Sequence, residues 1–272
     1  MSEYNFSTQT LRLEGVINAR ELGGYVLPDG SRIKPGMLMR GGSLAKASDA
    51  DMEKLKDLNL AHIFDFRTKD EVRIAPDREL DGAEYHWLPA IDPATIERVE
   101  TGDEKMFADL NYFMVNFGNH PQLKHMARIM YSSLVTSEYT QLQYATFLQF
   151  VAKSEGSVYW HCSQGKDRTG LGAAFLLSAL GADRKLIMED YIISNEFYKA
   201  DVDSIIEQQK AKGWGEAEFN VVRTFVGVNP VYFEQALDII EEDYGSMDSY
   251  LRNELCLTEE DIQLMRSKYI CR

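Results

Sequence analysis

One stretch, residues 157–180, constrains the fold more than any other part of the 272-residue chain. It begins with Ser157 to His161, which are rich in β-branched and aromatic side chains, as is typical of a buried strand. The residues from Leu171 to Leu180 are apolar nearly all round, which predicts a fully buried helix. Cys162 and Arg168 lie between the two elements, so the pattern predicts a strand, a tight loop and a helix around a Cys-x5-Arg motif.

The residues of this loop indicate a binding site for a phosphate dianion. The start of a helix offers unpaired N–H groups and a partial positive charge, and Arg168 adds a planar fork that binds two oxygens. The same positive field is expected to lower the pKa of Cys162 and make it a thiolate nucleophile. We expect Thr169 either to donate its hydroxyl to this sulfur or only to begin the helix. The phosphate-binding candidates are Ser163, Gln164, Gly165, Lys166 and Thr169.

The run from His161 to Gly170, His-Cys-Ser-Gln-Gly-Lys-Asp-Arg-Thr-Gly, resembles the signature loop of the protein tyrosine phosphatase superfamily. Its last six residues resemble one branch of bacterial tyrosine phosphatases, some of them secreted by pathogens. Members of that branch dephosphorylate phosphotyrosine and, in several cases, phosphoinositides and phosphoserine or phosphothreonine. The resemblance extends from about Val16 to Arg266 through the motifs Asn18-x-Arg20-x-Leu22-Gly23-Gly24-Tyr25, Gly36-x-Leu38-x-Arg40 and Asp190-Tyr191-x-x-Ser194-Asn195. Taken alone, the first of these motifs is also compatible with a glycine-rich β-turn region.

Strand and helix patterns alternate along the first ninety residues. A helix from Asp49 to Leu58, capped by Ser48, precedes a strand from Leu60 to Phe66, and Thr68 begins a short helix before a strand from Glu84 to Leu88. This alternation predicts an α/β fold with a central, mostly parallel sheet flanked by helices, and the resemblance implies a tyrosine-phosphatase-like fold. Residues 196–268 predict a helical C-terminal part. We expect one domain over residues 1–272, with a loosely ordered lead-in over residues 1–15.

Residues 92–156 show little strand signal and predict an inserted helical region. The patterns favour helices over Glu104–Phe117, Leu123–Val135 and Glu138–Lys153, the last capped by Ser137. Their dense aromatic residues are typical of core packing. The alternative is a lid over the active site within residues of about 92–135, because related enzymes carry helical insertions that act in this way.

Expulsion of an alcohol or phenol from phosphorus requires a proton donor, and the sequence offers three. Asp167 lies in the loop, and relatives with Lys-Asp in this loop are thought to use that Asp; a structural role beside Arg168 or Lys166 is the alternative. Asp92 is the second candidate, although it lies seventy residues before Cys162. The third is Asp65, which ends a strand and is better explained as a structural partner for an arginine. Asp65, Arg67 and Cys162 all lie at the carboxyl ends of strands, so we expect them to converge. We expect His161 to orient the loop by hydrogen bonds.

Composition narrows the function. The net charge of −14 disfavours nucleic acid and anionic membranes as partners, and the buried helix is too short to span a bilayer. Three cysteines without paired spacing argue against a disulfide scaffold, and a thiolate needs a reducing compartment. No signal-peptide pattern begins the chain, so we expect a cytoplasmic protein. The histidines show no ligand spacing along the chain, so we expect neither a metal nor another cofactor.

These observations favour a phosphatase that acts on phosphate monoesters, with phosphotyrosine in proteins as the first substrate class. The runner-up among enzymes is a phosphatase for phosphoinositides or small-molecule phosphate monoesters, in which Lys166 contacts a second phosphate. The alternative of another class is an inactive phosphate-binding module. A thiol-redox protein is disfavoured because the chain has no Cys-x-x-Cys pair. The sequence leaves the oligomeric state open.

Overall fold

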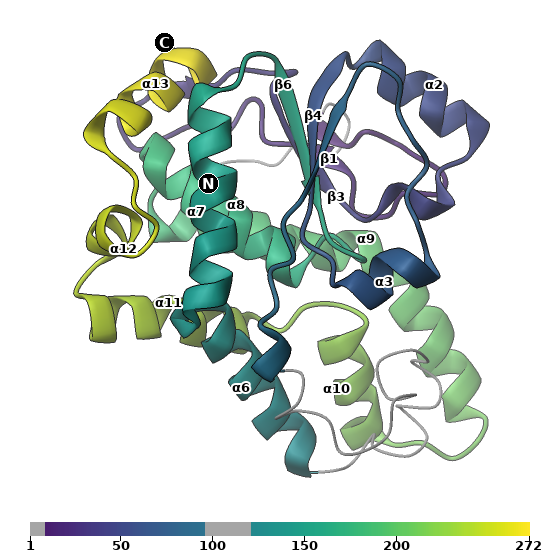
Figure 1. Ribbon diagram of the computed structural model, residues 1–272. Helices are drawn as coiled ribbons and strands as arrows, with labels where there is room; N and C mark the ends of the chain where they lie inside the picture. The colour runs from purple at the N-terminus through teal and green to yellow at the C-terminus, as the bar shows by residue number, and fades with distance from the viewer. Residues whose placement is uncertain (1–8, 96–120) are drawn as a thin grey trace.

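The computed structural model describes residues 9–95 and 121–272, and five of its strands form a central sheet (Figure 1). Their order is β1 (Arg20–Glu21), β3 (Leu38–Gly41), β6 (Ser157–His161), β4 (Leu60–Asp65) and β5 (Glu84–Trp87). The pairs from β3 to β5 are parallel, whereas β1 runs antiparallel to β3. The carboxyl ends of three central strands therefore meet at one edge, which is where open α/β sheets bind their ligands.

Helices cover both faces of this sheet (Figure 1). On one face lie α7 (Glu138–Lys153), α8 (Asp167–Leu180), α12 (Met247–Asn253) and α13 (Glu259–Tyr269). The other face packs against α2 (Asp49–Asp57) and a short 3-10 turn, η1 (Leu44–Lys46). Strand β6 supplies both layers because its side chains alternate: Val158 and Trp160 join the larger apolar core, and Tyr159 joins the smaller one.

The remaining elements extend this core. Helix α3 (Lys69–Ile74) follows β4; α6 (Pro121–Thr136) packs against both α7 and α11 (Pro230–Tyr244); and α10 (Glu216–Phe225) packs against the long α9 (Arg184–Lys210). A second, two-stranded sheet pairs β2 (Arg32–Ile33) with β7 (Ile270–Cys271), which ties the end of the chain to its beginning. Among the described residues, no helix is both long and apolar enough to cross a bilayer.

The predicted fold class is confirmed, and most of the predicted helix starts are as expected. The Ser48 hydroxyl accepts from the N–H of Asp51 at 3.1 Å, and the carboxylate of Asp51 in turn binds the N–H of Ser48, which completes a capping box at α2. Ser137 is the N-cap residue of α7, as predicted, but its side chain forms no capping hydrogen bond. Its hydroxyl instead donates to Asp92 at 2.7 Å, across the sequence.

The predicted insertion is only partly described. Its second helix is α6, whose Tyr131 and Leu134 are buried in the larger core, so this part of the insertion packs as part of the core. The predicted helix over residues 104–117 lies outside the described residues, and so does most of the proposed lid. The expectations of one domain and of a loosely ordered lead-in stay predictions.

Candidate active site

The loop after β6 lies at the carboxyl edge of the sheet, and one glycine shows how tightly it is placed. Gly165 has a φ of +67°, a left-handed conformation that L side chains rarely adopt. A Cβ atom there would lie 2.1 Å from the carbonyl carbon of Gly41, at the end of β3. No side chain fits in that space, so the close approach of loop and strand depends on glycine at this position.

The loop directs its carbonyl groups outward. Ser163 O accepts from the N–H of Ser43 at 3.3 Å, Gln164 O from the hydroxyl of Tyr198 at 2.6 Å, and Gly165 O from Asn18 and Arg40 at 2.8 and 2.9 Å. With these carbonyls turned away, the N–H groups of the loop are left for its inner side, where the N-terminus of α8 adds its partial positive charge. This is the arrangement of a backbone nest that binds an anion.

Cys162 lies at the bottom of this loop with 3% of its surface exposed. Burial by itself raises the pKa of the thiol, but the charge of Arg168 and the hydroxyl of Thr169 outweigh it, so the pKa lies below its ordinary value. Among the described residues, the buried Thr169 hydroxyl has no hydrogen-bond partner, so its hydrogen is available to the sulfur of Cys162. The site therefore favours a thiolate at Cys162, the reactive form of cysteine.

Arg168 is held by Glu71 of α3, a residue that was not predicted to belong to the site. The terminal nitrogens of Arg168 donate to the two carboxylate oxygens of Glu71, each at 2.7 Å, and Nη1 also donates to the carbonyl of Phe66 at 3.2 Å. These bonds use three of the five N–H donors of the guanidinium group. The other two, on Nε and Nη2, form the side edge of the fork, which matches two oxygens of a phosphate.

Glu71 also fixes the loop itself. It accepts from the hydroxyl of Ser163 at 2.5 Å and from the N–H of Thr68, its own helix cap, at 2.8 Å. Burial raises the pKa of this carboxyl, but Arg168 more than offsets it and holds the pKa well below its ordinary value. The same ion pair raises the pKa of Arg168 despite burial. A single carboxylate thus couples helix α3 to both ends of the Cys-x5-Arg loop.

Asp167 begins α8 and lies between two buried tyrosines. Its Oδ1 accepts from the hydroxyl of Tyr131 and, at 3.3 Å, from the hydroxyl of Tyr191, and the two hydroxyls lie 2.6 Å apart. Burial raises the pKa of each tyrosine well above the ordinary value of a tyrosine, so both are neutral and can donate to the carboxylate of Asp167. These tyrosines come from α6 and α9, and neither was predicted as a site residue. The two hydroxyls orient the carboxyl group of Asp167, which is the first of the three predicted candidates for the proton donor.

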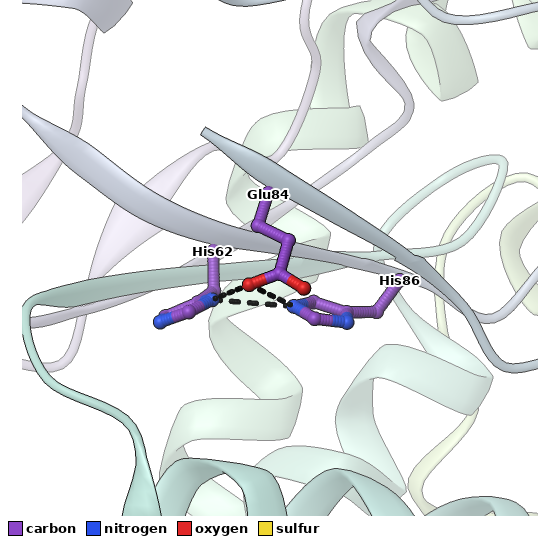
Figure 2. Close-up of side chains that lie close together, drawn as sticks. All are labelled: His62, Glu84 and His86. Carbon is purple, nitrogen blue, oxygen red and sulfur yellow. Dashed lines mark hydrogen bonds and ion pairs between the residues drawn. The ribbon is translucent and has the colours of Figure 1, made fainter. Parts of the chain in front are cut away.

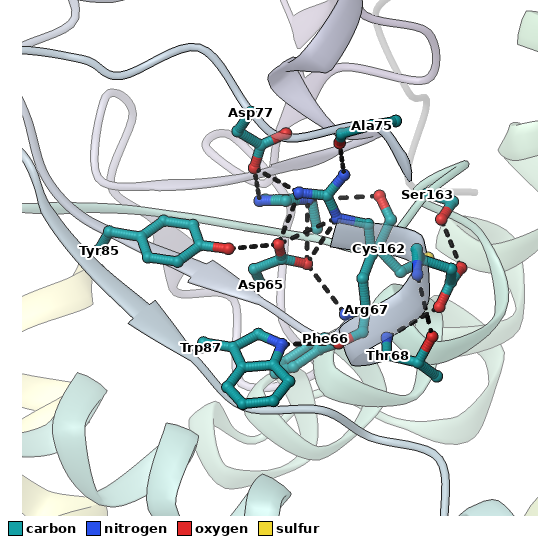
Figure 3. A network of polar contacts seen from close by, with 12 residues as sticks. Asp65, Phe66, Arg67, Thr68, Ala75, Asp77, Tyr85, Trp87, Cys162 and Ser163 are labelled. Carbon is teal, nitrogen blue, oxygen red and sulfur yellow. Dashed lines mark hydrogen bonds and ion pairs between the residues drawn. The ribbon is translucent and has the colours of Figure 1, made fainter. Parts of the chain in front are cut away.

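Asp65 belongs to a buried ion network beside the loop (Figure 3). Its carboxylate accepts from Arg67 at 2.7–2.9 Å and from the hydroxyl of Tyr85 at 2.5 Å, and it is completely buried. His161 joins the network, with Nε2 3.1 Å from Asp77. Burial lowers the pKa of His161, but Asp65 and Asp77 outweigh it and the net shift is upward. The structure therefore places Asp65, Arg67 and His161 in one buried network, in which Arg67 and Tyr85 bind the carboxylate of Asp65; their supporting role stays a prediction.

Asp92, the second candidate acid, lies in a different setting. Its carboxylate accepts from the N–H of Ala94 at 2.9 Å and from Ser137 at 2.7 Å. Among the described residues, none of its hydrogen bonds goes to the Cys-x5-Arg loop. Asp167 is itself a residue of the loop, whereas Asp92 lies between the segment after β5 and the start of α7.

The expectation that the Lys166 side chain contacts a second phosphate is wrong in this structure. Its ammonium group points away from the inner side of the loop and donates to the carbonyls of Phe225, Val226 and Gly227, at 2.5, 3.2 and 2.9 Å. These three bonds use all the donors that an ammonium group has. Burial lowers the pKa of Lys166. The residue links the loop to the end of α10 instead.

A buried shell of arginines supports the loop from below. Asp190 of α9 pairs with Arg20 at 3.2 Å and with Arg40, and it accepts from the hydroxyl of Tyr25 at 2.9 Å. Arg40 and Asn18 then bind the carbonyl of Gly165. Residues of the N-terminal motif, Asn18 to Tyr25, and Asp190 thus meet behind the loop. The N-terminal motif therefore supports the loop and is more than a glycine-rich turn region.

Comparisons with known proteins agree with this geometry. The model of the "Tyrosine phosphatase family" matches residues 11–271. A "Putative tyrosine-protein phosphatase" of Cupriavidus necator is 29% identical over 265 residues, which are 96% of this chain and 88% of that protein. The "Triple specificity protein phosphatase PtpB" of Mycobacterium tuberculosis is 29% identical over 89% of this chain and 92% of its own length. A "Tyrosine-protein phosphatase" of Nostoc commune is 26% identical over 89% of this chain and 81% of its own. The chain therefore belongs to the tyrosine phosphatase family and is a phosphatase.

Proposed function

We propose that this phosphatase hydrolyses phosphotyrosine in proteins through a cysteinyl-phosphate intermediate on Cys162. The observation that supports it most is the pairing of a thiol of lowered pKa with the free side edge of Arg168, inside one loop. An anion held by the loop and the fork would present its phosphorus to the sulfur. No metal is needed for the steps below, since the loop and Arg168 supply the positive charge.

In the first step, the Cys162 thiolate attacks phosphorus, the sulfur–phosphorus bond forms and the bond to the leaving oxygen breaks. The N–H groups of the loop and Arg168 stabilise the charge that spreads over the equatorial oxygens. Asp167 gives its proton to the leaving oxygen, which departs as a phenol. The Tyr131 and Tyr191 hydroxyls hold that carboxyl group in position.

In the second step, water attacks the phosphocysteine. Asp167, now a carboxylate, takes a proton from this water, the sulfur–phosphorus bond breaks and inorganic phosphate forms. The hydroxyl of Thr169 stabilises the departing thiolate, as its contribution to the lowered pKa of Cys162 indicates. The proton taken from water restores the protonated acid at Asp167, and the departing sulfur restores the thiolate at Cys162, so the cycle is complete.

The buried position of Lys166 bears on substrate class. Since its ammonium group is saturated by backbone carbonyls, it offers no charge to a second phosphate, which favours a substrate with a single phosphate. One relative carries "triple specificity" in its name, and this supports activity on more than one class of phosphate monoester as a second candidate. Because Cys162 must stay reduced, we also propose a cytoplasmic location, which cell fractionation would test.

A leaving-group series tests the proposal. We expect the wild type to hydrolyse aryl phosphates at rates nearly independent of the pKa of the phenol, because Asp167 protonates the leaving oxygen. Asp167→Asn should show rates that fall steeply as that pKa rises, and Cys162→Ser should have no turnover. Asp92→Asn is the matched control and should behave as the wild type.

A steep dependence in Asp92→Asn, with none in Asp167→Asn, would move the acid to Asp92. A wild type that binds phosphate without any turnover would favour the inactive phosphate-binding module instead.

A further inference from the structure

Two histidines and a glutamate meet on one face of strands β4 and β5, away from the Cys-x5-Arg loop (Figure 2). His62 and Glu84 are directly paired across the two strands, and His86 lies two residues beyond Glu84 on the same face. Figure 2 shows the three side chains turned toward one point below the strands. Strand pairing therefore collects, from residues far apart in sequence, the donor types that transition metals prefer.

The distances between the donor atoms match a metal polyhedron. His62 Nδ1 lies 3.2 Å from His86 Nε2 and 3.5 Å from Glu84 Oε2, and His86 Nε2 lies 3.8 Å from the same oxygen. Ligands of a tetrahedral Zn²⁺ ion, with bonds of about 2.0–2.1 Å, are separated by about 3.3 Å. A triangle with the observed sides has a circumscribed radius of about 2.0 Å, so one point lies at bonding distance from all three atoms.

The surroundings hold the imidazoles in place. The His86 ring stacks on Phe64 with centroids 4.6 Å apart and lies 4.7 Å from the ring of Phe150. The side chains of His62 and His86 are 14% and 9% exposed, whereas that of Glu84 is 65% exposed. An ion would thus have an apolar wall on one side and an open position for water on the other.

A second cluster of possible metal ligands already has its negative charge balanced by an arginine. Asp65, Asp77 and His161 also bring three donor atoms together, but Arg67 Nη2 lies 2.7 Å from Asp65 and 2.9 Å from Asp77. The guanidinium group supplies the cation there. Around His62, Glu84 and His86, no Lys or Arg side chain among the described residues forms an ion pair with Glu84.

We propose that His62, Glu84 and His86 bind one divalent transition-metal ion, with Zn²⁺ as the preferred occupant and water in the fourth position. Two imidazoles and one carboxylate suit Zn²⁺, which has no demand for a larger coordination number. The ion would link the edge strand β5 to β4, whose carboxyl end carries Asp65. We expected no metal site because the histidines show no ligand spacing along the chain. Such spacing does not reveal these ligands, because they come from two adjacent strands.

The experiment uses the full chain with Cys162, Cys256 and Cys271 replaced by serine, so that zinc bound to a thiolate cannot contribute. We expect one equivalent of Zn²⁺ at neutral pH with a Kd on the order of 10 µM or tighter, measured by competition with a chromophoric chelator. Zinc at about a hundred times Kd should raise Tm by roughly 5 °C. Co²⁺ in its place should give the intense visible bands of a tetrahedral ion.

The variants decide whether the site is the proposed one. Glu84→Gln and His86→Gln should each weaken zinc binding by tenfold or more and remove most of the Tm rise. His125→Gln, which changes an exposed histidine on α6, is the control and should leave binding unchanged. The absence of binding at about 100 µM Zn²⁺, or equal affinity in Glu84→Gln and the parent, would overturn the proposal.

Discussion

The pair of Glu71 and Arg168 allows the sharpest prediction about how the loop works. Glu71→Gln keeps the size of the side chain and one acceptor oxygen, but removes the charge that holds the guanidinium group. Both side chains are mostly buried, with 31% and 12% of their surfaces exposed. A surface ion pair contributes about 0–1 kcal/mol, and the loss of one partner from a fully buried pair costs about 3–5 kcal/mol. We therefore expect about 2 kcal/mol of lost stability, intermediate between these cases.

The effect on turnover should exceed the effect on folding. If Glu71 no longer aligns the fork, the side edge of Arg168 misses the equatorial oxygens, which is comparable to the loss of one oxyanion-stabilising donor. Such losses reduce kcat by roughly 10²–10³-fold. The assay is steady-state hydrolysis of an aryl phosphate at a temperature where chemical denaturation shows the variant to be folded. Asp70→Asn is the matched control, since it removes the same charge from the same turn of α3, on an exposed side chain.

The pH dependence of stability tests the same pair. The folded pKa of Glu71 lies below its ordinary value of about 4.3, so its contribution is complete above that pH and is lost as the pH falls toward the folded pKa. We expect the free energy of unfolding to fall less steeply below about pH 4.3 in Glu71→Gln than in the wild type. Turnover within twofold of the wild type in folded Glu71→Gln would refute the positioning role of this residue.

Three further predictions follow from single contacts. Thr169→Val should raise the pKa of Cys162, so the rate of thiol alkylation by iodoacetamide should need a higher pH to reach its plateau; an unchanged profile would exclude the hydrogen bond. In urea unfolding, Gly165→Ala should destabilise the protein by at least about 3 kcal/mol, because the strain of a positive φ and the clash with Gly41 add. Gly30→Ala, which has a positive φ but open space around it, should cost only about 1 kcal/mol. Asp190→Asn should cost about 3–5 kcal/mol because two buried guanidinium groups lose their counter-charge, and a smaller loss in urea unfolding would contradict the proposed buried shell.

The parts of the structure that the sequence predicted are those with local causes. The strand, loop and helix around Cys162 follow from side chains within a few residues of one another, and so do the caps at Ser48 and Thr68. The pairing of Asp65 with an arginine was also predictable, because its partner Arg67 lies two residues away.

The residues that were missed act over long separations. Glu71 lies 97 positions before Arg168, and Tyr131 lies 36 positions before Asp167, so neither pairing leaves a local pattern. Glu71 even has a sufficient local explanation, its capping box with Thr68, which conceals the second role. Lys166 was misplaced for a related reason. Its place in the loop predicts a basic side chain beside the phosphate, but the carbonyls that bind it, at Phe225 to Gly227, are brought there by tertiary packing.

The most direct test of the mechanism is to trap the intermediate. We would mix Asp167→Asn with p-nitrophenyl phosphate, whose good leaving group departs without an acid, and follow the first turnover by stopped flow. We expect a burst of nitrophenolate equal to the enzyme concentration, with one phosphoryl group found by mass spectrometry on the peptide that contains Cys162. Turnover without a burst and without a phosphoryl group on Cys162, at saturating substrate in an otherwise active variant, would contradict nucleophilic catalysis by this cysteine.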